Sequence, residues 1–173
     1  MSRADRTTLF LAVATGGLLL GWLLSVAYAF SPFAPQPEPF VLQWRDEEAL
    51  SRGTSIYAAR CAMCHGVGGE GVKAVSVRAS KSAAAPLDAS GHAWKQPDFA
   101  LVELVRSGAS PAMCLTLSLA MPRFTETLSD REIAEVLAYV KSRWPAEQRA
   151  FQDEVNAVHA APNAVLRRQL GLE

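Results

Sequence analysis

Cys61-Ala62-Met63-Cys64-His65 is the stretch from which the rest of the chain is interpreted. Two thiols three positions apart can add across the two vinyl groups of one porphyrin, and the adjacent imidazole can then reach the iron through Nε2. C-x-x-C-H is the attachment signature of a c-type haem. A disulfide or half of a zinc site is the alternative, but a zinc ribbon needs a second ligand pair, and neither Cys114 nor His159 supplies one at a suitable spacing. The motif therefore predicts one covalently attached haem, with His65 as an iron ligand.

The composition limits the function classes. The 173 residues suffice for one domain plus appendages. Because 17 basic and 17 acidic residues balance to zero net charge, we expect neither a nucleic-acid binder nor a polybasic membrane-surface protein. The three cysteines exclude a disulfide framework if the haem takes two of them, and Cys114 is then expected to be a small buried apolar residue.

Residues 9–30 form an uncharged, mostly apolar run. As a helix this run would be about 33 Å long, against a hydrocarbon core of about 30 Å. Arg3 and Arg6 precede it, and the next basic residue is Arg45. Since a basic flank stays in the cytoplasm, everything after residue 30 is expected on the outer, periplasmic side of the cytoplasmic membrane.

The alternative for this segment is a cleaved signal peptide, because Ala27-Tyr28-Ala29 fits a cleavage site. The apolar run is longer than the usual signal-peptide core of about 7–15 residues. We therefore expect residues 1–30 to be a membrane anchor. Residues 31–45, with four prolines in their first ten positions, are expected to be an extended Pro-rich linker.

The first soluble helix is predicted over residues 44–60, directly before the haem motif. Gly53 could break this helix, and Thr54 or Ser55 could then cap the start of the part that runs into the motif. Gly53 and Tyr57 are four positions apart and share one helix face. A glycine there permits the close approach of another helix.

Two further helices follow from the pattern. Residues 98–107 carry apolar side chains at helical spacing, with Pro97 and Gly108 suited to the start and end. Ser129, with Glu132 three positions later, forms the pattern of a capping box that opens the last helix of the domain.

Gly53 eight residues before Cys61, the aromatic Tyr57, and the run Cys-x-x-Cys-His-Gly together resemble the opening of a class I cytochrome c. The resemblance covers about residues 50–144. It implies an all-α, cytochrome c-like domain around one haem, in which the first and last helices cross and a loop delivers a methionine to the iron. An aromatic residue at that crossing would be Tyr139, packed against Gly53 and Tyr57.

The resemblance also assigns residues around the haem. Pro86 and Leu87 match a proximal Pro-Leu pair, where a backbone carbonyl accepts the Nδ1–H of the haem histidine; an ordinary turn is the alternative. Trp94 could close the pocket and donate to a propionate, or be a core residue. Met121, followed by proline, resembles the sixth ligand of the family, with Met113 as the alternative. The expected haem-binding residues are Cys61, Cys64, His65, Pro86, Leu87, Trp94 and Met121.

Together these patterns predict an N-terminal transmembrane helix, a cytochrome c domain over residues 46–145, and a tail over 146–173 that is partly ordered or docks a partner. A haem with both axial positions filled has no vacancy for substrate, so one-electron transfer is expected. The chain would be a tethered carrier between respiratory or photosynthetic complexes, or a fixed haem subunit of an oxidase or dehydrogenase. A haem sensor or peroxidase would need an open axial site.

Overall fold

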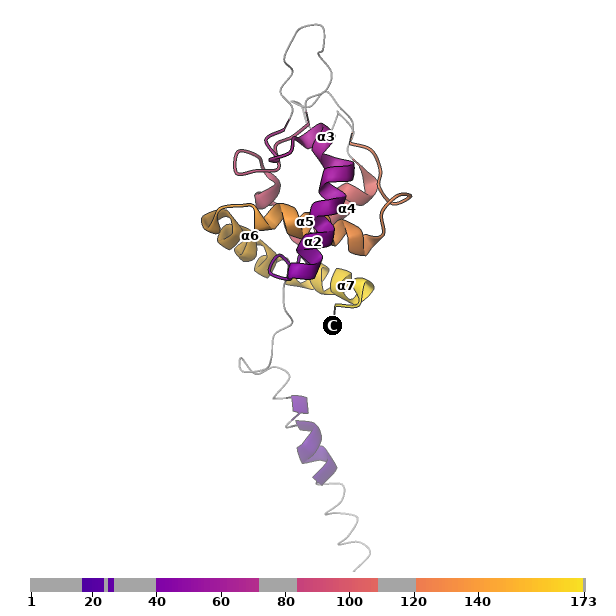
Figure 1. The fold of residues 1–173 in the computed structure, drawn as a ribbon. Coiled ribbons are helices and arrows are strands. Elements are labelled where there is room, and N and C mark those ends of the chain that lie inside the picture. Colours follow the sequence, from indigo (N-terminus) through magenta and orange to yellow (C-terminus); the bar gives the residue numbers. More distant parts are fainter. Residues whose placement is uncertain (1–16, 24, 27–39, 72–83, 109–120, 173) are drawn as a thin grey trace, which may run out of the picture. The chain divides into compact units, whose positions relative to one another are not determined.

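A computed structural model of the chain describes residues 17–23, 25–26, 40–71, 84–108 and 121–172. The chain divides into two compact units, Met1–Pro37 and Glu38–Glu173. Every regular element in the described residues is helical, in agreement with the predicted all-α class (Figure 1).

The N-terminal unit is described only at residues 17–23 and 25–26, which are helical and expose large apolar side chains such as Leu18 and Trp22. No helix within the described ranges is both long and apolar enough to cross a membrane. Most of the predicted span over residues 9–30 lies outside the described residues, as does the predicted linker up to residue 39.

The second unit is built of helices and helical turns, the first of which begins at Glu47, within the predicted range 44–60. Its elements are α2 (Glu47–Ile56), the π-helical turn η1 (Tyr57–Cys61), α3 (Ala62–His65), the 3₁₀ turn η2 (Ala93–Lys95), α4 (Asp98–Ser107), α5 (Asp130–Ser142), α6 (Ala146–Val158) and α7 (Ala160–Leu170). The cap of α2 is Asp46, whose side chain accepts from the Ala49 N–H. The expectation that Thr54 or Ser55 caps the helix is wrong, because their hydroxyls donate to carbonyls one turn earlier. Gly53 does not break the helix.

The backbones of α2 and α5 approach each other closely where they cross, as the glycine at position 53 indicated. A Cβ atom on Gly53 would lie 2.2 Å from the carbonyl oxygen of Glu135, so only glycine permits this backbone contact. The rings of Tyr57 and Tyr139 pack beside it with centroids 5.2 Å apart. The predicted meeting of these residues is confirmed.

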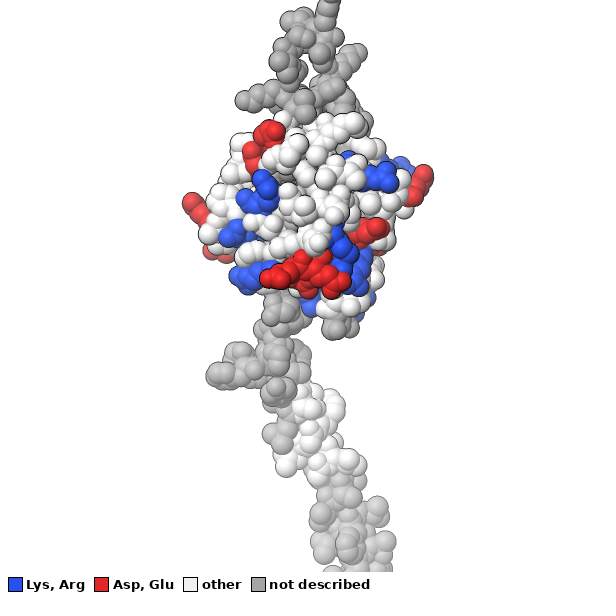
Figure 2. All heavy atoms as spheres, viewed as in Figure 1, with Lys and Arg blue, Asp and Glu red and all other residues white. Residues whose placement is uncertain are grey.

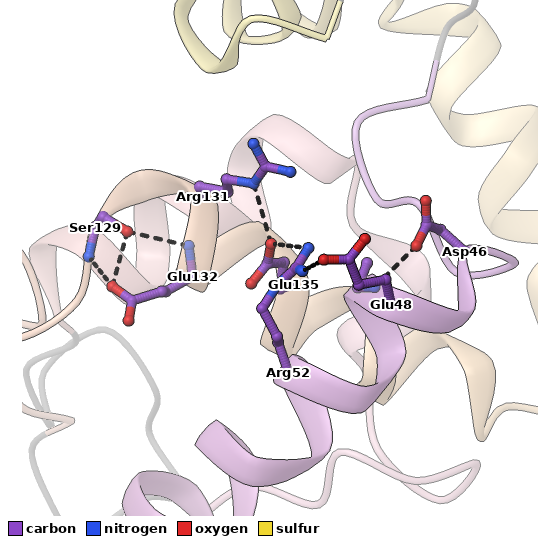
Figure 3. A network of polar contacts seen from close by, with 8 residues as sticks. Asp46, Glu48, Arg52, Ser129, Arg131, Glu132 and Glu135 are labelled. Atoms are coloured by element: carbon purple, nitrogen blue, oxygen red, sulfur yellow. Dashed lines mark hydrogen bonds and ion pairs between the residues drawn. The ribbon is translucent and has the colours of Figure 1, made fainter.

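A cluster of ion pairs covers the solvent side of this crossing (Figure 3). The nearly buried carboxylate of Glu135 lies 2.8 Å from Arg52 Nη2 and 3.1 Å from Arg131 Nε. Arg52 also pairs with Glu48 on its own helix. Two guanidinium groups thus neutralise a carboxylate that the helix contact has largely removed from water.

The other predicted helix signals are also present. α4 spans residues 98–107 with Pro97 before it and Gly108 after it. The Ser129 hydroxyl accepts from the Glu132 N–H, and the Glu132 carboxylate accepts from the Ser129 N–H at 2.8 Å (Figure 3). The capping box that opens α5 is therefore confirmed.

Asp98, at the start of α4, is fully buried and organises distant parts of the chain. One carboxylate oxygen accepts from the backbone N–H groups of Val41 and Leu42 at 2.7 and 3.0 Å. The other accepts from the side-chain amides of Gln152 and Asn156 at 2.7 and 2.9 Å. The last residues of the predicted linker therefore belong to the domain.

Residues 146–172 form α6 and α7 and pack onto the domain, which differs from the expectation of a partly ordered tail. Their inner face carries amides beside Leu166, since Asn156 and Asn163 are fully buried. Asn156 Oδ1 accepts from the Asp98 N–H at 2.8 Å, and Asn163 Oδ1 accepts from the Phe99 N–H at 3.0 Å. These amides satisfy N–H groups that have no intrahelical partner at the start of α4.

Lys141 joins α5 to α6. Its side chain is fully buried, and Nζ donates to Asp153 Oδ1 on α6 at 2.6 Å. The ammonium also lies 5.3 Å from the ring centroid of Phe40. A buried charge of this kind depends on its partner.

Candidate haem site

The motif lies where the first helical segment ends. Cys61 is the last residue of the π-helical turn, and Cys64 and His65 belong to α3. The N–H of Ala62 donates to the carbonyl of Tyr57 five positions earlier, a wider turn that is often found at functional sites. Positions 61, 64 and 65 share one helix face, so both thiols and the imidazole project to the same side.

The His65 ring is held by the backbone of a distant loop. Its Nδ1 lies 2.8 Å from the carbonyl oxygen of Ala85, the residue before Pro86. Because a carbonyl only accepts, Nδ1 carries the proton and Nε2 keeps its lone pair. Burial lowers the pKa of His65, against the opposing effect of the Ala85 hydrogen bond. The imidazole is thus neutral, as an iron ligand must be.

Two hydrogen bonds at Leu87 hold the loop around Ala85 in place. The carbonyl of Gly69 accepts from the Leu87 N–H at 2.7 Å, which joins the turn after the motif to the segment that contains Ala85. From the end of α5, the Trp144 indole N–H donates to the Leu87 carbonyl at 2.8 Å. No sequence pattern assigns this role to Trp144, although an indole N–H directly after a helix end must find an acceptor when it is buried.

Tyr57 connects the helix crossing to the end of the motif. Its hydroxyl donates to the carbonyl of Gly66 at 2.8 Å, and Gly66 has a φ of 83°, which favours glycine. Burial raises the pKa of Tyr57 to about 12. The hydroxyl therefore remains a donor at neutral pH.

The two thiols are free and half-buried. Burial, reinforced by the neighbouring Cys64, raises the pKa of Cys61 to about 11. The Cys61 thiol therefore carries its proton at neutral pH. The part of the chain that the structure describes contains no cluster of three or more His, Cys, Asp or Glu side chains that could hold a metal ion.

Trp94 carries a buried indole N–H that meets no acceptor among the described residues. Its ring packs edge-on against Phe151, with centroids 5.3 Å apart, and Lys95 Nζ lies 4.9 Å from its centroid. A buried donor without a partner costs about 1–3 kcal/mol. An added carboxylate, such as a haem propionate, would satisfy it.

Met121 is half-buried and packs against the core beside α4. A Cβ on Gly108, at the end of α4, would lie 2.5 Å from the Met121 carbonyl oxygen, and the Phe124 N–H donates to the Val105 carbonyl at 3.3 Å. These backbone contacts hold the segment of Met121 at the end of α4. The alternative ligand Met113, like Cys114, lies outside the described residues.

A family model described as cytochrome c oxidase, cbb3-type, subunit III matches residues 48–140, more than half of the chain. The matched range contains the α2–α5 crossing, the motif and the loop that holds His65. Comparisons with curated proteins and with solved structures gave no significant match.

Proposed function

Since the chain belongs to the cytochrome c family that the model of cbb3-type oxidase subunit III describes, its domain is one for haem-based electron transfer, and we propose that it carries single electrons on one covalently bound haem c. Cys61 and Cys64 would form the two thioethers. His65 and Met121 would be the axial iron ligands.

The hydrogen bond from His65 to Ala85 is the observation that supports this proposal most strongly. It fixes the tautomer and the orientation of the ring, and it makes Nε2 a stronger donor. The bound haem would supply the one-electron Fe(III)/Fe(II) couple. The chain's own task is to hold the ligands in nearly the same geometry in both oxidation states, and the crossing at Gly53 and the Trp144 contact support that rigidity.

The unpartnered Trp94 N–H supports the fit of a haem to this domain. A propionate carboxylate would accept from it and so be neutralised in part by a hydrogen bond. The proposed contact of Pro86 and Leu87 with the proximal side follows from their place next to Ala85, whose carbonyl already holds the His65 ring.

Met121 would complete the coordination. A thioether is a soft ligand that favours the ferrous state and raises the reduction potential relative to a second imidazole. Its support is the Met-Pro pattern and its half-buried position beside α4. With both axial positions filled, electron transfer is favoured over a haem sensor or a peroxidase.

Electron exchange would take place next to the motif. Met63 and Val67 are strongly exposed on either side of Cys64 and His65, and the surface around α3 in Figure 2 shows few charged side chains. An apolar contact of this kind suits a redox partner that binds briefly and releases quickly.

Two settings suit such a carrier. It could move between respiratory or photosynthetic complexes, held on the outer side of the cytoplasmic membrane by residues 1–30. The family model, named for an oxidase subunit, favours the second setting, a fixed haem subunit of a larger oxidase. Extraction in mild detergent followed by sizing separates the two, because only a fixed subunit elutes together with other polypeptides.

Haem attachment tests the proposal directly. The full chain, produced in a host that exports it and attaches haem c, should keep its haem absorbance through denaturing electrophoresis. Cys61→Ser or Cys64→Ser should leave a single thioether, and the double variant should lose the haem. Met63→Ala, inside the motif, is the matched control and should retain it. A wild-type protein that releases its porphyrin on denaturation would contradict the proposal.

A further inference from the structure

Two side chains of the C-terminal segment donate hydrogen bonds to the backbone of one short turn. The Trp144 indole N–H donates to the Leu87 carbonyl at 2.8 Å, and Gln148 Nε2 donates to the Ala89 carbonyl at 3.0 Å. Trp144 is 1% exposed and lies between α5 and α6, and Gln148 lies in the first turn of α6. The turn is therefore held at two carbonyls from the junction of these helices.

The start of α6 is itself fixed by separate contacts. One turn after Gln148, the side chain of Gln152 is fully buried, and its Nε2 donates to the Gln96 carbonyl at 3.1 Å and to Asp98 Oδ1 at 2.7 Å. On the same helix, Asp153 accepts from the buried ammonium of Lys141 at 2.6 Å. Because α6 is anchored in this way, the two donors have a fixed base.

The two acceptors lie in a tightly folded turn directly after Ala85. The Gly91 N–H donates to the Asp88 carbonyl at 3.1 Å, and a Cβ on Gly91 would lie 2.0 Å from the Pro86 carbonyl oxygen. The proline ring also fixes φ at position 86. Since the turn has so little freedom, a displacement of the Leu87 carbonyl must move the Ala85 carbonyl as well.

The Ala85 carbonyl is the acceptor for the predicted iron ligand, because it lies 2.8 Å from His65 Nδ1. A hydrogen bond at Nδ1 makes Nε2 a stronger electron donor. A stronger donor favours the ferric state, which carries the higher charge, over the ferrous state. Hydrogen bonding around the iron ligands is one of the means by which a protein sets a reduction potential.

The donors and the ligand lie in different parts of the chain. The match to the family model ends at residue 140, so that His65 and Ala85 lie inside it and Trp144 and Gln148 follow it. We propose that Trp144 and Gln148 are positioning residues for His65, which hold the Ala85 carbonyl against Nδ1 and thereby set the reduction potential. This inference rests on the proposed haem c, which His65 would ligate.

Potentiometric titration of the haem-loaded full chain tests this role. Trp144→Phe removes the indole N–H and keeps an aromatic ring, and Gln148→Met removes the amide at nearly constant length. Loss of either donor should weaken the bond at His65 and raise the potential. At a given applied potential, Trp144→Phe should raise the ratio of reduced to oxidised protein about threefold, which equals a shift of about 30 mV at about 59 mV per tenfold change. Gln148→Met, at a less buried position, should raise it about twofold.

The matched control is Ser129→Ala, which removes the side-chain cap at the opposite end of α5. Its potential should equal that of the wild type. The proton resonance of His65 Nδ1–H in the reduced protein is a second readout. This resonance should move to higher field, and the proton should exchange faster with deuterated water, in the Trp144 and Gln148 variants but not in the control.

Haem-loaded variants whose potential is unchanged overturn the inference, because the turn would then keep its place without these donors. A lower potential also overturns it, because that sign indicates greater exposure of the haem to water. If Trp144→Phe does not fold, Gln148→Met decides, since its side chain is only partly buried. A wild type that holds no covalent haem on denaturing electrophoresis would instead contradict the proposed function and this inference together.

Discussion

Replacing the carboxylate of Asp98 by an amide should break the contact that joins three distant parts of the domain. Asp98→Asn keeps the size of the side chain. All four groups that face the two carboxylate oxygens are donors, namely the N–H groups of Val41 and Leu42 and the amides of Gln152 and Asn156. An asparagine can accept through one oxygen only, so its NH₂ group must face two other donors.

The expected magnitude follows from that geometry. A hydrogen bond to a charged acceptor contributes about 1.5–3 kcal/mol, and two of the four at Asp98 are lost whichever way the amide is oriented. We therefore expect the free energy of unfolding to fall by about 3–5 kcal/mol. A domain of this size has about 5–15 kcal/mol in total, so the variant should remain folded at 25 °C but unfold at much lower urea concentration.

The assay is urea unfolding of the haem-loaded full chain, followed by far-UV circular dichroism. Asp88→Asn is the matched control, because Asp88 accepts only from the N–H and hydroxyl of Ser90 in an exposed turn; its effect should stay within about 0.5 kcal/mol. If Asp98→Asn lies within about 1 kcal/mol of the wild type, the reasoning about this buried network is refuted.

The other two stability predictions concern the helix contacts. Gly53→Ala would place a Cβ 2.2 Å from the Glu135 carbonyl oxygen and should lower the free energy of unfolding by about 2–4 kcal/mol; Ser51→Ala, exposed on the same helix, should change it by less than about 0.5 kcal/mol. Equal urea midpoints for the two variants would show that the helices are not in backbone contact. Asp153→Asn should leave the buried ammonium of Lys141 without its counter-charge and cost about 2–4 kcal/mol in thermal unfolding at pH 7. An unchanged melting temperature would mean that Lys141 has another partner.

The helix crossing could be predicted from the sequence because its signals are local. A glycine and a tyrosine four positions apart mark a face that another helix can approach closely, and Ser129 with Glu132 marks the start of that second helix. The resemblance to class I cytochromes c supplied Tyr139 as the residue that meets them. Each of these contacts is present in the structure.

The packing of the C-terminal helices could not be predicted in the same way. Patterns of apolar residues indicate which face of a helix is buried, but in α6 and α7 apolar residues such as Val158 are exposed. Beside Leu166, the buried positions are Gln152, Asn156 and Asn163, and amides are buried only where distant donors and acceptors are available. Those partners, at Asp98 and Phe99, are more than fifty residues away.

The haem site was predictable in part. C-x-x-C-H places both thiols and His65 on one helix face, and the resemblance supplied the idea of a backbone acceptor for Nδ1. That the acceptor is the Ala85 carbonyl depends on Gly69 and Trp144, which both bond to Leu87 in the same loop but lie far from each other in the sequence. Contacts of this kind have no sequence pattern of their own.

Carbon monoxide binding to the reduced, haem-loaded protein tests most directly whether the iron is closed on both sides. The wild-type spectrum should not change on addition of carbon monoxide, because Met121 would occupy the sixth position. Met121→Ala should bind it and shift the Soret band. A wild type that binds carbon monoxide as readily as the variant would contradict the assignment of Met121 and, with it, the proposal of a pure electron carrier.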